Sequence, residues 1–323
     1  MKKFLYKLLK FSIVPLLLII GVELFIQMNK NNLLNEENLE SQFLTEANQY
    51  TWINNLNEKP IRVLAGSSSV KYSLSCTKLT KLSDDKFQYV NIAEDARDPI
   101  VTYYILKSLN LKNIEAVYFG LDPWIYTKSY YKHRNDIFYS DLNLLQAIRF
   151  NSEHNNSTLK KRLTNVLTKP SNSSPKNYII PKDFGTVILK QNPTNFKNPK
   201  DWFQVETYGW SKIQFEYLRK IKLLCQKNKI DFFVFIPPKR SDFTLSYKKE
   251  CWELHNEFNE LLEEYNINSF VFGKYTDLEN VGDKINFADA FHLNERGQRN
   301  YSKLFYKMSN SKSNSLNKKY DWF

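Results

Sequence analysis

The stretch IRVLAGSSSVKY (residues 61–72) changes from mainly apolar to polar residues at a glycine. Its first five residues form a short β-branched and apolar run, which predicts a buried strand that ends at Gly66. Three consecutive serines, residues 67–69, then follow, although a plain turn would need no hydroxyl groups there. The pattern raises the question of whether one of these serines is a nucleophile at the end of a strand.

Strands and helices are predicted to alternate along the rest of the chain. Four further apolar runs predict strands at Phe87–Ile92, Glu115–Leu121, Asp231–Ile236 and Ser269–Gly273. Helical spacing of apolar residues predicts helices at Asp98–Leu111, Trp210–Asn228, Tyr247–Asn266 and Asn294–Met308. This alternation predicts an α/β fold in which helices cover both faces of a parallel sheet. Ligands of such sheets bind at the carboxyl ends of the strands, where the serines are expected.

The N-terminal segment indicates an uncleaved signal anchor. Lysines precede an apolar run at 11–26, which together with Leu8 and Leu9 nears the ~17–25 residues that cross a bilayer. No small-x-small cleavage pattern follows this run, although a cleaved signal peptide is the alternative and gives the same compartment. We expect a cytoplasmic end at 1–10, a transmembrane segment at 11–28 and an extracytoplasmic remainder in the cell membrane.

The remainder is expected to contain a stalk, one domain and a tail. Residues 29–58 are polar and predict a stalk, residues 59–310 form the predicted α/β domain, and residues 311–323 form a polar tail. An irregular insert at about 124–205 is rich in Asn, Pro, Ser and Lys, and loops of this length are usually functional or flexible. Its aromatic residues form either a satellite hydrophobic core, which we favour, or a glycan-facing cap.

Charge and cysteine content narrow the classes of partner and site. The formal net charge is +12, mostly from scattered lysines, which favours an anionic surface or polymer as neighbour; a merely solvated lysine-rich surface is the alternative. No nucleic-acid partner is expected, because no zinc-finger spacing or RNA-binding aromatic signature occurs. No metal site or other cofactor is expected, and buried thiols are favoured over a disulfide for Cys76, Cys225 and Cys251.

A nucleophilic serine needs a base within hydrogen-bond reach, and the base needs a partner that selects its tautomer. Of the four histidines, His133 and His154 fall in the insert, and His255 falls in a predicted amphipathic helix as a surface or packing residue. His292 follows the last predicted strand and lies three residues after Asp289. In a turn that leads into a helix, this spacing can bring the carboxylate beside the imidazole.

Two segments resemble blocks of a known family. AGSSS (65–69) and DAFHLNERG (289–297) resemble the first and last sequence blocks of the SGNH/GDSL hydrolase superfamily. The resemblance implies a three-layer α/β/α, flavodoxin-like domain. It aligns Ser68 with the family nucleophile, and Asp289 and His292 with the D-x-x-H pair. We therefore predict that these three residues form a catalytic triad.

A membrane-anchored branch of this superfamily is the closer resemblance. Ser67 stands where the family has the aspartate of G-D-S, and Gly66 and Ser67 are expected to line the site. The G-S-S form, the basic anchor and the IPPK strand end (236–239) resemble the D-alanyl-transfer protein of teichoic-acid modification and polysaccharide O-acetylation proteins.

The oxyanion hole departs from the family pattern. The resemblance implies donors from Ser68, from a glycine amide and from an asparagine amide. Ala96 stands near the glycine position, where any backbone N–H serves, but Asp122 stands at the asparagine position. An ionised carboxylate cannot donate, and losing one such donor typically costs about 10²–10³ in rate. Either the Ser68 and Ala96 amides suffice, or activity is low, or Asp122 has another role, such as a turn residue before Pro123.

The expected function is acyl-ester chemistry on a cell-envelope polysaccharide or anionic polymer, by a membrane-anchored acyltransferase or esterase. Transfer is favoured, because an anchor holds the domain near a membrane acyl donor. The resemblance implies that a multipass membrane acyltransferase delivers this donor. The alternative is a non-catalytic accessory or scaffold protein of an envelope-polymer acylation system, which binds polymer or a membrane partner. The anchor disfavours a free lipase or esterase.

Overall fold

The chain is described by a computed structural model. It describes residues 43–127 except 45 and 57, 181–190 except 182, 209–272 except 268 and 269, and 281–310, with scattered positions between 3 and 40. The chain divides into two units, and the larger one, Phe43–Tyr130 with Ser174–Phe323, contains every element named below. The smaller unit, Met1–Gln42 with Tyr131–Ser173, is described only at scattered positions.

Several predicted segments fall partly or wholly outside these ranges. The expected cytoplasmic end at 1–10, the anchor at 11–28 and the stalk at 29–58 are described only in part. Most of the insert and the tail at 311–323 lie outside the described residues. Within the described ranges, none of the helices combines the length and the apolar character that a membrane crossing requires.

Five strands form one parallel sheet in the order β2-β1-β3-β4-β5. They are β1 (Ile61–Ala65), β2 (Gln88–Asn91), β3 (Ile114–Gly120), β4 (Asp231–Phe235) and β5 (Phe270–Phe272). In the central register Val63 lies opposite Val90 on one side and Val117 on the other. The predicted α/β fold with a parallel sheet is confirmed, and this strand order is compatible with a flavodoxin-like fold.

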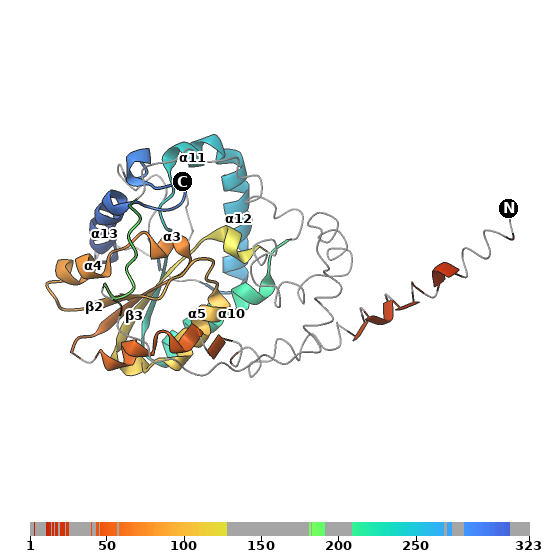
Figure 1. Ribbon diagram of the computed structural model, residues 1–323, viewed down its shortest axis with the longest axis horizontal. Helices are drawn as coiled ribbons and strands as arrows, with labels where there is room; N and C mark the ends of the chain where they lie inside the picture. The colour runs from red at the N-terminus through yellow and green to blue at the C-terminus, as the bar shows by residue number, and fades with distance from the viewer. Residues whose placement is uncertain are drawn as a thin grey trace. The chain divides into compact units, whose positions relative to one another are not determined.

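Helices pack on both faces of the sheet (Figure 1). The helices are α3 (Ser68–Lys71), α4 (Cys76–Leu82), α5 (Pro99–Ser108), α10 (Lys212–Lys227), α11 (Ser241–Ser246), α12 (Lys248–Glu264) and α13 (Glu295–Asn310), with short 3-10 turns η1 (Thr51–Asn55), η2 (Leu111–Asn113), η3 (Pro123–Tyr126) and η6 (Lys284–Asn286). Helices α4 and α13 pack together on one face of the sheet, and α5 and α10 pack together on the other.

Helix α4 was not predicted from the sequence, because seven residues are too few to display helical periodicity. Ser75 caps its first turn, where the serine hydroxyl accepts a hydrogen bond from the Lys78 N–H at 3.3 Å. Cys76 and Leu79 are completely buried beneath it. Short helices have little stability of their own, so packing against β2 and α13 stabilises α4.

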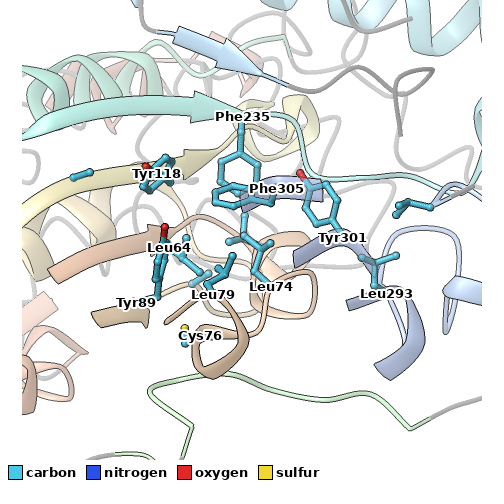
Figure 2. Packing of buried hydrophobic residues seen from close by; sticks show 14 of the residues in the cluster. Leu64, Leu74, Cys76, Leu79, Tyr89, Tyr118, Phe235, Leu293, Tyr301 and Phe305 are labelled. Carbon is cyan, nitrogen blue, oxygen red and sulfur yellow. The ribbon is translucent and has the colours of Figure 1, made fainter. Parts of the chain in front are cut away.

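The core between the sheet and the α4/α13 layer consists of apolar side chains from strands and helices that are far apart in the sequence. Leu64, Leu79, Tyr118, Phe235 and Phe305 are each at most 2% exposed. Figure 2 shows these side chains together, with the Phe305 ring 5.1 Å from that of Phe235 and 5.4 Å from that of Tyr118 in edge-to-face contacts. Burial of each such side chain contributes about 1.5–3 kcal/mol, which attaches α13 to the sheet.

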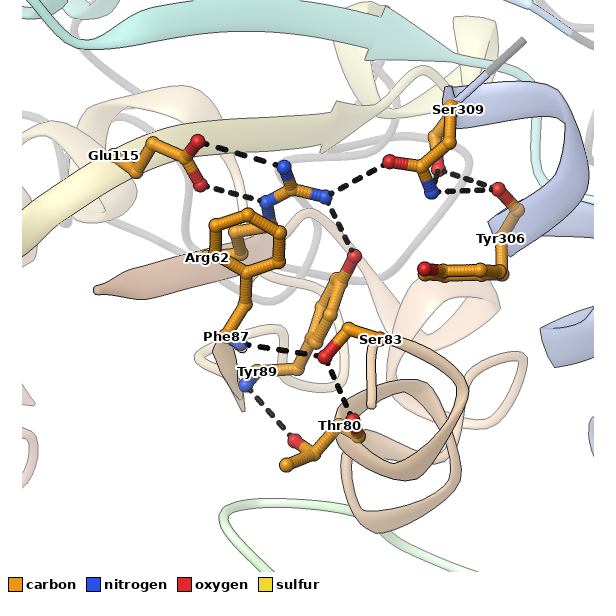
Figure 3. Close-up of polar contacts among 9 residues, drawn as sticks. Arg62, Thr80, Ser83, Phe87, Tyr89, Glu115, Tyr306 and Ser309 are labelled. Atoms are coloured by element: carbon orange, nitrogen blue, oxygen red, sulfur yellow. Dashed lines mark hydrogen bonds and ion pairs between the residues drawn. The ribbon is translucent and has the colours of Figure 1, made fainter. Parts of the chain in front are cut away.

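Arg62 interrupts the apolar pattern of β1 and is only 9% exposed. Its guanidinium donates to Glu115 Oε2 at 2.8 Å, to the Tyr89 hydroxyl at 3.0 Å and to Asn310 Oδ1 at 3.3 Å (Figure 3). The guanidinium carbon also lies 3.6 Å from the centre of the Phe87 ring. A buried charge is tolerated only with such partners, so Arg62 links three strands to the end of α13.

Two contacts tie described residues of the insert to the domain. Thr127 and Trp210 form an antiparallel bridge. Within the insert, residues 183–190 run past the edge strand β2, where the Asn91 N–H donates to the Phe184 carbonyl at 2.9 Å. Gly185 permits this approach, because a Cβ there would lie 2.1 Å from the Asn91 oxygen. The insert thus covers part of an edge strand that would otherwise expose unpaired backbone groups.

Three aromatic residues of the insert are described, and all three pack inside the domain. Trp124 and Tyr126 are 5% and 1% exposed. Phe184 packs against the core of the α4/α13 face, and its ring lies 6.5 Å from that of Trp52. These three residues therefore have packing roles within the domain. The other aromatic residues of the insert lie outside the described residues.

Candidate active site

Gly66 turns the chain at the carboxyl end of β1, so that the serines begin helix α3. Its φ is 138°, and a Cβ there would lie 2.7 Å from the Val70 side chain, so glycine is required. Ser67 is the N-cap of α3, and its hydroxyl accepts a hydrogen bond from the Ser69 N–H at 3.3 Å. Ser68 is therefore the first residue of the helix.

The three serines differ in their exposure to solvent. Ser67 and Ser69 are buried, with 2% and 3% of their surface exposed. Ser68 is only partly buried. An external substrate can therefore reach the Ser68 hydroxyl, whereas the hydroxyl groups on either side of it face the interior.

A tight loop between β5 and α13 holds the predicted acid and base. Residues 287–293 form this loop, which is closed by an antiparallel bridge between Phe287 and Leu293. Asp289 Oδ1 accepts backbone hydrogen bonds from the Phe291 N–H at 2.8 Å and the His292 N–H at 2.9 Å. These two bonds hold the carboxylate so that its second oxygen faces the imidazole.

The structure brings Ser68, Asp289 and His292 together. His292 Nε2 lies 2.9 Å from Ser68 Oγ, and His292 Nδ1 lies 2.7 Å from Asp289 Oδ2. Because a carboxylate only accepts, Nδ1 carries the proton of the neutral ring and Nε2 is left to accept from the serine. Burial tends to raise the pKa of Asp289, but its hydrogen bonds and the charge of the imidazolium form of His292 outweigh burial and lower that pKa.

Tyr72 supports the imidazole from the side. Its ring contacts that of His292 edge-on at 5.2 Å between centroids. The imidazole is thus held by a carboxylate at one nitrogen and by an aromatic ring at its side. Sequence reasoning missed this contact, although Tyr72 lies only four positions after Ser68.

Ala96 lies in the loop after β2, at the same edge of the sheet as Ser68. Its φ of 54° is in the left-handed region that favours glycine, which is the family residue near this position. The Glu94 N–H donates to the Gly66 carbonyl at 3.3 Å and so ties this loop to the serine turn. Among the described residues, the N–H groups of Ser68 and Ala96 donate no hydrogen bond.

Asp122 starts the η3 turn with its carbonyl, which accepts from the Ile125 N–H at 3.0 Å, while its side chain takes part in a buried polar network. It precedes η3, yet its side chain makes no capping hydrogen bond there. Asp122 is 0% exposed; its Oδ1 accepts from Lys239 Nζ at 2.7 Å, and its Oδ2 accepts from the Ser67 hydroxyl. Of the alternatives for Asp122, the structure therefore favours a role outside the oxyanion hole. Its charge is balanced by an adjacent ammonium group.

Lys239 follows β4 and is a second site residue that sequence reasoning missed. It is 1% exposed, and it donates to Asp122 and, at 2.8 Å, to Ser69 Oγ. Its Nζ also lies 4.5 Å from the Trp124 ring and 5.4 Å from the Phe291 ring, within cation–π range. The only available signal was a lysine directly after a buried strand and two prolines, in IPPK.

A lysine beside a serine hydroxyl is also the arrangement of Ser-Lys nucleophiles. Burial lowers the pKa of Lys239, which would favour such a role, but the carboxylate of Asp122 acts in the opposite direction. An ammonium held by a carboxylate cannot accept a proton from Ser69. Because Ser69 is also buried, it is a poor candidate nucleophile compared with Ser68.

The other histidine and cysteine residues of the described regions have structural roles. His255 is 1% exposed, its Nδ1 bonds the Cys251 carbonyl, and burial lowers its pKa to about 3, so it is a neutral packing residue. All three cysteines are buried free thiols, as favoured from the sequence. No cluster of His, Cys, Asp or Glu in the described ranges could hold a metal ion. His133 and His154 lie outside the described residues.

Comparisons of this chain with protein-family models, curated proteins and solved structures found no match. Its function is therefore argued from the geometry of the site and from the residues that form it.

Proposed function

We propose that this chain is a membrane-anchored, SGNH-like acyltransferase or esterase that acts on a cell-envelope polysaccharide or anionic polymer. The observation that carries the proposal is the hydrogen-bonded series Ser68–His292–Asp289, with distances of 2.9 and 2.7 Å. Ser68 and His292 are 224 positions apart in the sequence, and of the three consecutive serines only Ser68 is partly exposed. The arrangement meets the requirements of an activated nucleophile.

In the first half-reaction His292 Nε2 removes the Ser68 proton as Ser68 Oγ attacks the carbonyl carbon of an acyl ester. Asp289 stabilises the imidazolium that forms, because its carboxylate accepts the Nδ1–H. The tetrahedral oxyanion is stabilised by the N–H groups of Ser68 and Ala96. Collapse breaks the ester bond, the leaving alcohol takes the proton from Nε2, and an acyl-Ser68 intermediate remains.

In the second half-reaction an acceptor hydroxyl gives its proton to His292 Nε2 and attacks the acyl carbon. Ser68 Oγ leaves and regains the proton, which restores the enzyme. A sugar hydroxyl as acceptor gives acyl transfer, and water gives hydrolysis. Transfer is supported by the basic, apolar N-terminal segment, which would hold the domain near a membrane acyl donor delivered by a multipass partner.

Several features support the acceptor class and the family resemblance. The net charge of +12 favours an anionic polymer as neighbour. The sheet order, the serine after β1 and the acid–base pair before the last helix agree with the SGNH arrangement that the sequence resembles. The pairing of Asp122 with Lys239 balances a carboxylate charge that would oppose a developing oxyanion, which supports the catalytic role over a non-catalytic scaffold.

Covalent labelling with a serine-directed fluorophosphonate tests the proposal. The wild-type protein should be labelled at Ser68, as mapped by peptide mass spectrometry. Ser68→Ala and His292→Ala should abolish labelling, because they remove the nucleophile and its base. Ser67→Ala and Ser69→Ala retain the nucleophile and its base, so the label, whatever its rate, should still map to Ser68.

A cellular test separates catalysis from a scaffold role. Ser68→Ala should remove envelope-polymer acylation as completely as deletion of the whole protein does. If Ser68→Ala cells kept normal acylation while deletion abolished it, the scaffold role would replace the catalytic one.

A further inference from the structure

The two serines that flank the nucleophile are each bonded to one member of a buried ion pair. Ser67 Oγ donates to Asp122 Oδ2, and Ser69 Oγ accepts from Lys239 Nζ at 2.8 Å. Lys239 Nζ and Asp122 Oδ1 lie 2.7 Å apart, and both side chains are at most 1% exposed. The ion pair thus contacts the serine turn on both sides of Ser68.

We infer that Asp122 and Lys239 are positioning residues, which hold Ser67 and Ser69 and thereby aim Ser68 at His292. This inference rests on the proposed function, since it treats Ser68 as the nucleophile. Neither residue touches the reacting atoms. They act through the backbone of the serine turn.

Each hydrogen bond in this network has only one direction. The Asp122 carboxylate can only accept and the Lys239 ammonium can only donate. Ser67 Oγ already accepts from the Ser69 N–H, so its own proton is available for Asp122. Ser69 Oγ must accept from Lys239. A buried network whose hydrogen bonds have fixed directions favours a single arrangement of the turn, which preorganises the nucleophile.

Lys239 also adjoins the loop that holds the base. Its Nζ lies 5.4 Å from the ring of Phe291, which directly precedes His292. The next residue, Arg240, donates its backbone N–H to the Ala290 carbonyl at 3.1 Å. The segment that follows β4 therefore contacts both the serine turn and the loop that holds Asp289 and His292. It can fix the position of one relative to the other.

The test compares Lys239→Met, Asp122→Asn and the double variant Asp122→Asn/Lys239→Met. Each single variant leaves one buried charge without its partner, so it should be less stable and should also label more slowly. The double variant removes both charges, so its melting temperature should return toward that of the wild type. Its labelling at Ser68 should nevertheless remain slower by about 10- to 100-fold, because Ser69 has lost its hydrogen-bond donor Lys239 and one side of the turn is no longer held.

A control is the partly buried ion pair between Arg62 and Glu115, near the amino ends of β1 and β3 and therefore at the opposite end of these strands. Glu115→Gln breaks the pair with Arg62 and should reduce stability without slowing the labelling of Ser68. If the double variant Asp122→Asn/Lys239→Met regained wild-type labelling together with its stability, the pair would serve the fold alone. The positioning role would then be refuted.

A second measurement does not depend on activity. Amide hydrogen exchange is followed in the peptide that covers residues 66–72, in a Ser68→Ala background. Adding the substitutions Asp122→Asn and Lys239→Met should speed exchange in this peptide, whereas adding Glu115→Gln should not. Unchanged exchange would refute the positioning role of Asp122 and Lys239. If exchange becomes faster but the wild-type protein takes no fluorophosphonate label, the positioning of the turn would be upheld and the proposed chemistry rejected.

Discussion

Asparagine at position 122 would match the family pattern that the sequence resembles, and it would supply an amide donor. The structure predicts that Asp122→Asn is nonetheless harmful. Lys239 is 1% exposed, and Asp122 is its carboxylate partner at 2.7 Å. The substitution leaves a buried ammonium without a counter-charge, and breaking such a pair typically costs about 3–5 kcal/mol.

The loss of stability should depend on pH in a defined direction. Burial lowers the pKa of Lys239 in the folded protein, and Asp122 acts against this shift. Without the carboxylate, the folded lysine binds its proton still less tightly, while the unfolded lysine keeps a pKa of about 10.4. Between these two pKa values the unfolded state binds more protons, so stability rises with pH. The stability gap between Asp122→Asn and wild type should therefore narrow as the pH is raised toward 10.

Thermal unfolding followed by circular dichroism measures this effect. At about 2–4 °C per kcal/mol for a domain of this size, Asp122→Asn should lower the melting temperature by roughly 6–20 °C at pH 7. The double variant with Lys239→Met is the control, and it should recover most of the loss. An Asp122→Asn protein that melts with the wild type at pH 7, or that hydrolyses a simple acetyl ester faster, would refute the reasoning.

Other substitutions and probes address the packing, the acid–base pair, the thiols and the topology. Gly120→Ala places a Cβ 2.2 Å from a Val70 methyl carbon and should cost about 1–3 kcal/mol in urea unfolding; an unchanged midpoint would contradict this. Asp289→Asn should be less stable than wild type above the usual aspartate pKa of about 4. That gap should shrink in melts at lower pH, because the lowered pKa of Asp289 stabilises only its ionised form. The cysteine thiols, whose pKa values burial raises to about 12, should react with a disulfide reagent only on unfolding, and fast reaction of the native protein would contradict their burial. Protease added to spheroplasts should digest the domain, and protection until lysis would contradict the extracytoplasmic placement.

The sequence by itself was sufficient for the features that short-range patterns encode. Each of the five strands appears as a short apolar run, since strands buried on both faces need continuous apolar side chains. The candidate catalytic triad could also be predicted from the sequence. Asp289 and His292 are three positions apart and meet through a local turn, and Ser68 follows a strand end that parallel-sheet topology places at the same edge.

Only the tertiary structure decided what lies beneath the nucleophile. Asp122 and Lys239 are 117 positions apart and follow different strands. Read alone, Asp122 is a carboxylate that opposes an oxyanion, and Lys239 is one of many lysines. The roles of both residues become clear only in the fold, where β3 and β4 lie side by side and the two side chains form an ion pair from which water is excluded. The physical reason is that a charged residue's role depends on its burial and its partner, and neither is encoded by neighbours along the chain.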